Sequence, residues 1–120
     1  MENLHKLGMD GQKAAEDFLQ GKGYRILKTN YRIRTGEIDI IAKDRGGYIV
    51  FAEVKYRRGL SHGYPREAVT KAKQNKIVRT AMHYISANVQ EPEQDFRFDV
   101  VEVLAKDGKL YVNHIENAFE

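Results

Sequence analysis

The sequence predicts a mixed α/β fold with the element order αβββαββ, in a single domain spanning residues 1–120. Two stretches carry apolar residues at helical spacing. Five other stretches are rich in β-branched and aromatic residues and are bounded by turn-forming residues. A chain of 120 residues can bury roughly two-thirds of its unfolded surface, so the predicted fold needs no disulfide or structural metal.

The first helix is expected over residues 10–20, with residues 1–8 loosely ordered. Its apolar stripe contains Ala14, Ala15, Phe18 and Leu19. Glycines at positions 21 and 23 are typical helix-ending residues. Residues 24–32 follow as the first expected strand, and a polar turn at 34–36 leads into the next.

Residues 36–58 predict a β-hairpin whose turn contains Asp44, Gly46 and Gly47. On its second strand, one face carries Ile49, Phe51, Glu53 and Lys55, and the other carries Val50, Ala52, Val54 and Tyr56. Because both faces are largely apolar, we expect a central strand that is buried on both sides. Charges at the end of such a strand are costly unless they are paired or bind a metal.

A longer helix is expected over residues 66–87, after a loop at 59–65 that we expect to be mobile without nucleic acid. Its apolar arc is Gln74, Ile77, Val78, Ala81, Met82, Tyr84 and Ile85. Strands at 96–104 and 110–115 complete the chain, joined by a hairpin turn at Asp107 and Gly108.

The composition limits the kinds of site that the chain can build. There are no cysteines, and the four histidines lack metal-ligand spacing, so any metal would be held by oxygen atoms. Oxygen ligands favour Mg²⁺ or Mn²⁺. No apolar run reaches the roughly 18 residues that a membrane span needs, and no apolar signal region opens the chain. We therefore expect a cytoplasmic protein without a membrane segment.

Charge is distributed unevenly along the chain, although the net charge is only +3. Residues 54–80 hold eight basic side chains and one acid, whereas residues 91–120 hold three basic and eight acidic side chains. The basic block directly follows the acidic hairpin, as expected if a phosphate backbone crosses that face. A solvated basic helix would give the same pattern.

Asp39, followed after thirteen residues by Glu53-Val54-Lys55, resembles the active-site core of the PD-(D/E)XK nuclease superfamily. A wider series of motifs resembles the YraN-like family of uncharacterised bacterial proteins, similar in fold to archaeal Holliday-junction resolvases. These motifs begin at Gly11 and occupy residues 22–27, 30–32, 36–39, 53–55, 67–69, 97–101 and 117–119. The resemblance implies a restriction-endonuclease-like αβββαβ core, with a central mixed sheet flanked by helices.

The resemblance also implies a site for metal-dependent phosphodiester hydrolysis. Asp39 and Glu53 would bind Mg²⁺ or Mn²⁺, with the Val54 carbonyl as a third ligand and Glu37 as an outer one. Lys55 would contact the attacking water and a phosphate oxygen. Gln74, and less directly Lys73, would lie beside the site. The residues expected to contact backbone phosphates are Arg57, Arg58, Lys71, Lys73 and Lys76.

Each assignment has a plainer alternative. Glu53 and Lys55 could form an exposed ion pair, and Glu37 could pair with Arg32 or Arg34. Gln74 could be a half-exposed side chain near the helix start. Asp99, on the face opposite Phe96 and Phe98, is expected to be a structural partner for a basic residue rather than a metal ligand.

The first helix departs from the family pattern. Related proteins often have Glu directly after the glycine that corresponds to Gly11, but this chain has Gln12. Glu16 lies one turn further on and could reach the same side, or could be a surface charge. A neutral amide is a weak metal ligand, so this departure bears on catalysis.

Three functions therefore compete. The first is a Mg²⁺- or Mn²⁺-dependent endonuclease acting on DNA rather than RNA, with branched or structured substrates, in repair or recombination. The second is a nuclease-like accessory protein that binds nucleic acid without cutting it. The third is a protein-interaction module whose basic and acidic halves dock across subunits. The likeness to resolvases also implies a homodimer.

Overall fold

The protein is described here by a computed structural model that covers residues 4–58 and 69–119, with side chains from residue 11 to 57 and from 69 to 119. The elements follow the predicted αβββαββ order. They are α1 (Leu4–Gly21), β1 (Arg25–Ile33), β2 (Gly36–Lys43), β3 (Ile49–Arg58), α2 (Lys71–Asn88), β4 (Phe96–Lys106) and β5 (Lys109–Phe119).

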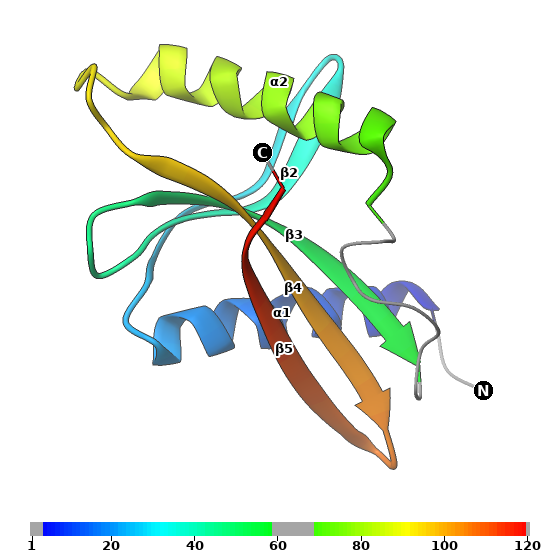
Figure 1. The fold of residues 1–120 in the computed structure, drawn as a ribbon. Helices are drawn as coiled ribbons and strands as arrows, with labels where there is room; N and C mark the ends of the chain where they lie inside the picture. The colour runs from blue at the N-terminus through cyan, green and yellow to red at the C-terminus, as the bar shows by residue number, and fades with distance from the viewer. Residues whose placement is uncertain (1–3, 59–68, 120) are drawn as a thin grey trace.

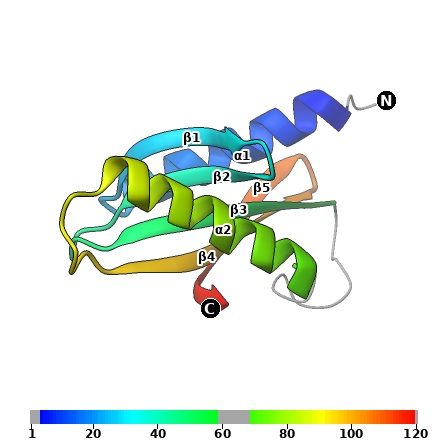
Figure 2. The same ribbon diagram turned by 90° about the horizontal axis from the view of Figure 1, so that it is seen from above.

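The five strands form one mixed sheet in the order β1-β2-β3-β4-β5. Only β3 and β4 are parallel, and α2 makes the crossover between them. Figure 1 shows α2 on one face of the sheet and α1 on the other, and Figure 2 shows α2 running across the strands. The sequence prediction of an α/β fold with a central mixed sheet flanked by helices is confirmed.

The strand β3 is central and buried on both faces, as its sequence predicted. Ile49 and Phe51 pack into the core beneath α2, and Val50 and Ala52 pack into the core above α1. The same alternation continues on β4, where Phe98 faces α2. Glu53 therefore continues the α2-facing row of β3.

Two expectations about the helices are corrected. The backbone of α1 already begins at Leu4, so part of the segment expected to be loose is helical. In α2, Met82 is 40% exposed, and Thr80 takes a fully buried position instead. The reason lies across the helix interface, where Gly36 of β2 has no side chain and leaves room for the Thr80 hydroxyl.

The start of α2 is fixed by Thr70, whose hydroxyl accepts a hydrogen bond from the Lys73 backbone N–H at 3.1 Å. The expected helical turn at 66–70 and the mobility expected of loop 59–65 lie largely outside the described residues. Among the described helices, none is long and apolar enough to cross a membrane.

Candidate functional site

The candidate site forms where β2 and β3 separate. Their antiparallel pairing runs from Lys43–Ile49 to Ile40–Ala52. Beyond that point the Val54 backbone N–H donates to the Asp39 carboxylate, with N···Oδ2 at 2.8 Å. The Asp39 carboxylate, rather than a backbone carbonyl of β2, therefore accepts the hydrogen bond of the Val54 N–H.

A change of direction in the backbone accompanies this separation. Ile38 packs toward α2 and Ile40 toward α1, although residues two apart share a face in a regular strand. Across from Asp39, between the pairs Thr29–Ile40 and Tyr31–Ile38, lies Asn30 with φ of 51°. Asparagine tolerates this left-handed conformation better than most residues.

Glu53 reaches the same place from β3 and is bound by a lysine of α2. Its Oε1 lies 2.9 Å from Nζ of Lys73. The Glu53 side chain is only 8% exposed, whereas that of Lys73 is 44% exposed. Lys73 lies in the first turn of α2, so the start of α2 covers the site on one face of the sheet.

The two carboxylates influence each other strongly. Burial, and then the charge of Glu53, raise the pKa of Asp39 to about 7, against the hydrogen bond from Val54. Burial, and then the neighbouring ammonium of Lys73, lower the pKa of Lys55. For Lys73 itself burial acts to lower the pKa, but the hydrogen bond to Glu53 and its charge outweigh burial and raise it. The site therefore gathers two acids and two lysines whose charges act on one another.

A surface hollow of about 210 Å³ opens onto these groups. Its lining residues are Gly36, Glu37, Asp39, Glu53, Lys73, Lys76 and Ile77. A Cβ on Gly36 would meet the Thr80 hydroxyl and the Lys76 carbonyl, so glycine lets β2 approach α2 closely here. The hollow is large enough for several waters or a phosphate group.

These groups suit a hard divalent cation. Mg²⁺ is commonly held by one or two carboxylates with several waters, and Asp39 and Glu53 supply two carboxylates that repel each other when both are charged. The Val54 carbonyl would be the additional oxygen. Among the described side chains, those of residues 11–57 and 69–119, no cluster of three or more His, Cys, Asp or Glu could hold a metal. The donor set therefore fits Mg²⁺ or Mn²⁺ with water ligands rather than an all-protein cage.

The structure places the other predicted site residues unequally. Glu37 lines the hollow and also accepts a hydrogen bond from Arg32 Nε at 2.8 Å, so Arg32 is its partner among the alternatives considered. Gln74 turns away, and its amide donates to the Val69 carbonyl at 2.9 Å. Lys73, rather than Gln74, is the α2 side chain that contacts Glu53.

The predicted phosphate-contacting residues are also divided. Lys71 and Lys76 are exposed on α2, and Lys76 lines the hollow. Arg57 is held in an ion pair with Glu102, at 3.4 Å between Nε and Oε2, and its side chain is 25% exposed. The backbone of Arg58 ends β3, and its side chain lies outside the described part.

Glu102 was missed by the sequence interpretation. It is 5% exposed on β4 and pairs with Lys55 in the parallel register. A signal was present, because Glu102 has the same strand parity as Phe98 and Val100, which face α2. It fixes Arg57 beside the site.

Among the described side chains of α1, from residue 11 onward, no acid lines this hollow. Gln12 donates its amide to Glu16, with 3.2 Å between Nε2 and Oε2. Helix α1 packs on the opposite face of the sheet through Ala15 and Leu19. Gly11 lies against the ring of Tyr56, where an added Cβ would collide. Gln12 is therefore part of the helix that covers the face of the sheet opposite α2.

Asp99 has the structural role expected from the sequence. It is fully buried and accepts hydrogen bonds from Arg97 Nε at 3.0 Å and from the Asn117 backbone at 3.0 Å. His114 Nε2 lies 2.7 Å from its other oxygen. Burial would raise the pKa of Asp99, but its bonds to His114 and Arg97 outweigh that effect and lower it. The histidine partner was not foreseen.

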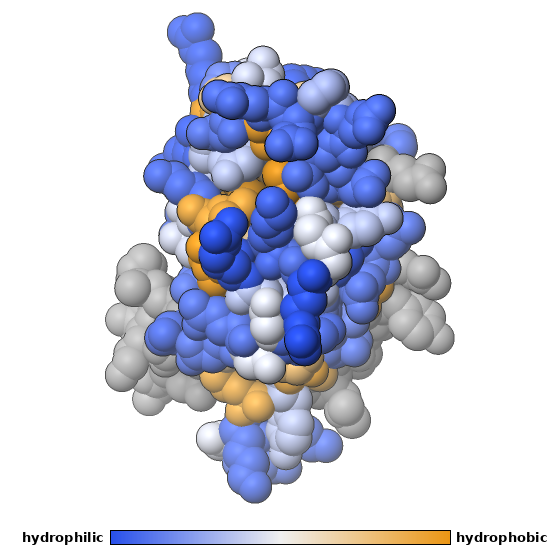
Figure 3. Space-filling model, turned by 90° about the vertical axis from the view of Figure 1, so that its left-hand side faces the viewer, coloured by the Kyte–Doolittle hydropathy of each residue, from blue (hydrophilic) through white to orange (hydrophobic). Residues whose placement is uncertain are grey.

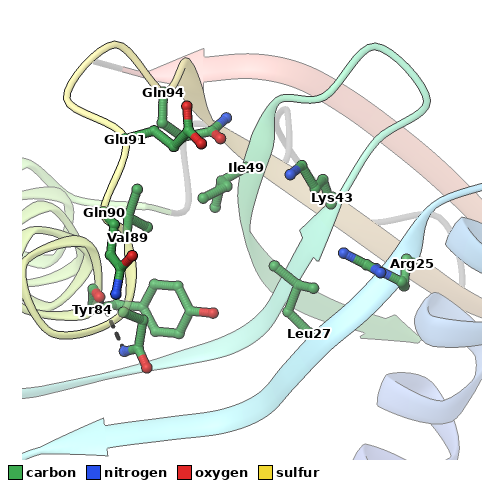
Figure 4. Close-up of a pocket in the computed structure, with 10 residues that line it drawn as sticks. Arg25, Leu27, Lys43, Ile49, Tyr84, Val89, Gln90, Glu91 and Gln94 are labelled. Carbon is green, nitrogen blue, oxygen red and sulfur yellow. Dashed lines mark hydrogen bonds between the residues drawn. The ribbon is translucent and has the colours of Figure 1, made fainter.

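A second hollow, of about 200 Å³, lies at the other end of α2. Figure 3 faces this end, where hydrophobic atoms show between hydrophilic groups, and Figure 4 shows the lining side chains. Arg25 and Lys43 are cross-strand neighbours on one wall, and Glu91 and Gln94 lie on another. Its mixed charges show no grouping comparable to the two acids of the first hollow.

Fold and site together define an α/β protein with one buried and one half-buried carboxylate and a basic helix at one end of its sheet. The sequence model of the Uncharacterised protein family UPF0102 matches residues 11–103, and the chain belongs to this family. This confirms the family resemblance found in the motifs.

The chain is also similar to individual proteins of the same family. The chain is 50% identical over 111 residues to a UPF0102 protein of Trichlorobacter lovleyi, covering 92% of this chain and 87% of that one. It is 50% identical over 115 residues to a UPF0102 protein of Symbiobacterium thermophilum, covering 95% and 96%. A solved structure of SfsA from Pyrococcus furiosus in complex with Ca²⁺ aligns with a TM-score of 0.38 at 13% identity, over 95% of this chain and 64% of that one.

Proposed function

We propose that this protein is a Mg²⁺- or Mn²⁺-dependent endonuclease that hydrolyses phosphodiester bonds in DNA, with a preference for branched or structured substrates. The observation that carries the proposal is the convergence of Asp39 and Glu53 on one hollow, with Lys55 and Lys73 beside them. A structural ion pair would need only one acid and one base. A buried and a half-buried carboxylate that repel each other are instead typical of a site that binds a cation.

The residues divide the work as follows. Asp39 and Glu53 would hold the metal, which when bound would polarise the phosphate and make water a better nucleophile. The Val54 N–H orients the Asp39 carboxylate. Lys55, with its lowered pKa, would orient the attacking water or stabilise charge on the phosphate. Exposed Lys71 and Lys76 would hold the strand by its phosphates.

The test is a cleavage panel with purified protein in Mn²⁺ and then Mg²⁺. Substrates are labelled four-way junction, flap, duplex and single-stranded DNA. Asp39→Asn is the site variant, since Asn can still accept the Val54 hydrogen bond. Asp17→Asn, at an exposed position on α1, is the matched control for an acid-to-amide change. Cleavage by wild type and the control, absent in Asp39→Asn and in chelator, is expected. Equal cleavage by both variants would refute the assignment.

A second candidate function is nucleic-acid binding without cleavage. Gln12 motivates it, because relatives often have Glu at this position and the neutral amide here bonds to Glu16. Tight, salt-sensitive binding to one DNA structure without turnover, and unchanged in Asp39→Asn, would favour this function. We also propose a homodimer, since branched DNA offers two equivalent strands; sedimentation of the free protein tests it.

A further inference from the structure

We propose that the Lys73 ammonium occupies the cation position of the metal-free site and exchanges with the divalent metal, moving outward to the substrate phosphate when the metal enters. This inference rests on the proposed function, because it assumes that Asp39 and Glu53 are the metal-binding pair. It gives Lys73 two positions, one in the empty site and one on the bound strand.

The contact geometry carries the first half of the argument. Lys73 Nζ lies 2.9 Å from Glu53 Oε1, one of the two carboxylate oxygens through which Glu53 could bind a metal. Its charge also acts on Asp39, so it lies near both acids. An ammonium and a divalent cation cannot both occupy hydrogen-bonding distance from the same oxygen without strong repulsion. Metal binding through Oε1 therefore requires that this contact break.

The helix geometry carries the second half. The backbone of Lys73 is fixed by its hydrogen bond to the Thr70 hydroxyl, so the first turn of α2 need not move. The side chain is 44% exposed and has four rotatable bonds, so its charged end can leave Glu53 while its stem stays in place. Lys76 lines the same hollow, so a phosphate bound by Lys76 would lie at this hollow.

Lys76 also provides a matched comparison. It is a lysine of the same helix, one turn further along and lining the same hollow. Among the described residues it has no ion pair with either acid. If Lys73 acted only as one more positive charge near the site, replacing either lysine would change metal binding similarly. The exchange proposal predicts that replacing Lys73 changes metal binding more than replacing Lys76 does.

The first measurement is Mn²⁺ affinity by isothermal titration calorimetry, for wild type, Lys73→Met and Lys76→Met. Removing the competing ammonium should strengthen Mn²⁺ binding about tenfold in Lys73→Met, since a charge-assisted hydrogen bond no longer has to be broken. Lys76→Met should change it by less than about threefold, because an exposed charge is screened by solvent. Equal effects of the two variants would overturn the exchange.

The second measurement uses the unaltered chain, so it does not depend on a variant folding. Amine acylation followed by mass spectrometry reports how readily each lysine reacts. Saturating Mn²⁺ should raise the labelling rate of Lys73 several-fold and leave that of Lys76 unchanged, and Asp39→Asn should abolish the response. A Lys73 rate that Mn²⁺ does not alter refutes the exchange even if the protein cleaves DNA. No Mn²⁺ binding by any form would refute both the exchange and the proposed metal site.

Discussion

Replacing Asp39 with Asn should stabilise the metal-free protein at neutral and alkaline pH. Burial and the neighbouring Glu53 raise the pKa of Asp39 from 3.8 to about 7, so ionising it costs the folded state free energy. At about 1.4 kcal/mol per pH unit, the full difference is roughly 4 kcal/mol. The Asn amide leaves an N–H₂ group without an evident acceptor, at a cost of about 1–2 kcal/mol. A net gain of about 2–3 kcal/mol remains.

The direction of the Asp39 pKa shift determines the pH range over which stability changes. A carboxyl whose pKa is raised in the folded state contributes stability that is present below pH about 4 and lost as the pH rises through about 7. Asp39→Asn should therefore be about 1–2 kcal/mol less stable than wild type near pH 4, where only the cost of the amide remains, and should reach its net gain of about 2–3 kcal/mol above pH 7. Urea unfolding in EDTA at four pH values measures it.

Other groups also titrate over this range, so the difference between variant and wild type is the relevant quantity. Asp17→Asn, at an exposed acid, should show no such pH-dependent gain. A pH-independent difference for Asp39→Asn, or a loss of stability that grows with pH, would refute the picture of two mutually repelling acids. Saturating Mn²⁺ should then stabilise wild type and leave Asp39→Asn unchanged.

Three further outcomes follow from the structure. Asn30→Val should cost roughly 1–2 kcal/mol in urea unfolding because a β-branched residue resists positive φ, whereas Asn30→Gly should be tolerated; equal stability of the two would contradict the role of the backbone kink. Asp99→Ala should cost about 3–5 kcal/mol, because it removes the acceptor of Arg97 Nε and of the Asn117 backbone N–H and the partner of buried His114 Nε2. The contribution of Asp99 in wild type should be lost as the pH falls below about 4, since its pKa is lowered; a loss under 1 kcal/mol in denaturant titrations would refute this. Lys76→Gln should weaken DNA binding at all sequences and reduce the slope of log K against log salt by about one, as measured by fluorescence anisotropy; an unchanged slope would remove Lys76 from the phosphate contacts.

Much of the fold could be read from local sequence patterns. The alternation of β3 placed Glu53 and Lys55 on the face opposite Val54, and the structure agrees, because side chains two apart in a regular strand share a face. The apolar arc predicted for α2 was wrong at Met82. Helical periodicity shows which residues share a side of the helix, but not how much of that side is buried. The deciding feature was Gly36 on another element, which makes room for Thr80.

The candidate site was less accessible to sequence reasoning, because side-chain direction depends on tertiary contacts. Gln74 and Lys73 are adjacent, and both were candidates beside the acids. The cap formed by Thr70 sets the start of α2. From that start, the Gln74 amide meets the Val69 carbonyl, and Lys73 faces Glu53. Glu102 was predictable in burial by strand parity, but its ion pair with Arg57 depends on the parallel pairing of β3 and β4.

The position of Asp39 shows why a short motif can mark a site only in a particular backbone. In a regular hairpin, Val54 would bond to a strand carbonyl, and both acids would be ordinary members of neighbouring strands. Here the pairing ends at Ile40–Ala52, and Asn30 adopts positive φ across from Asp39. The separation frees the Val54 N–H for the Asp39 carboxylate. Asp39 and Glu53 therefore share a hollow because both neighbours of β2 are irregular near Asp39. The pairing with β3 ends there, and β1 has Asn30 at positive φ across from Asp39.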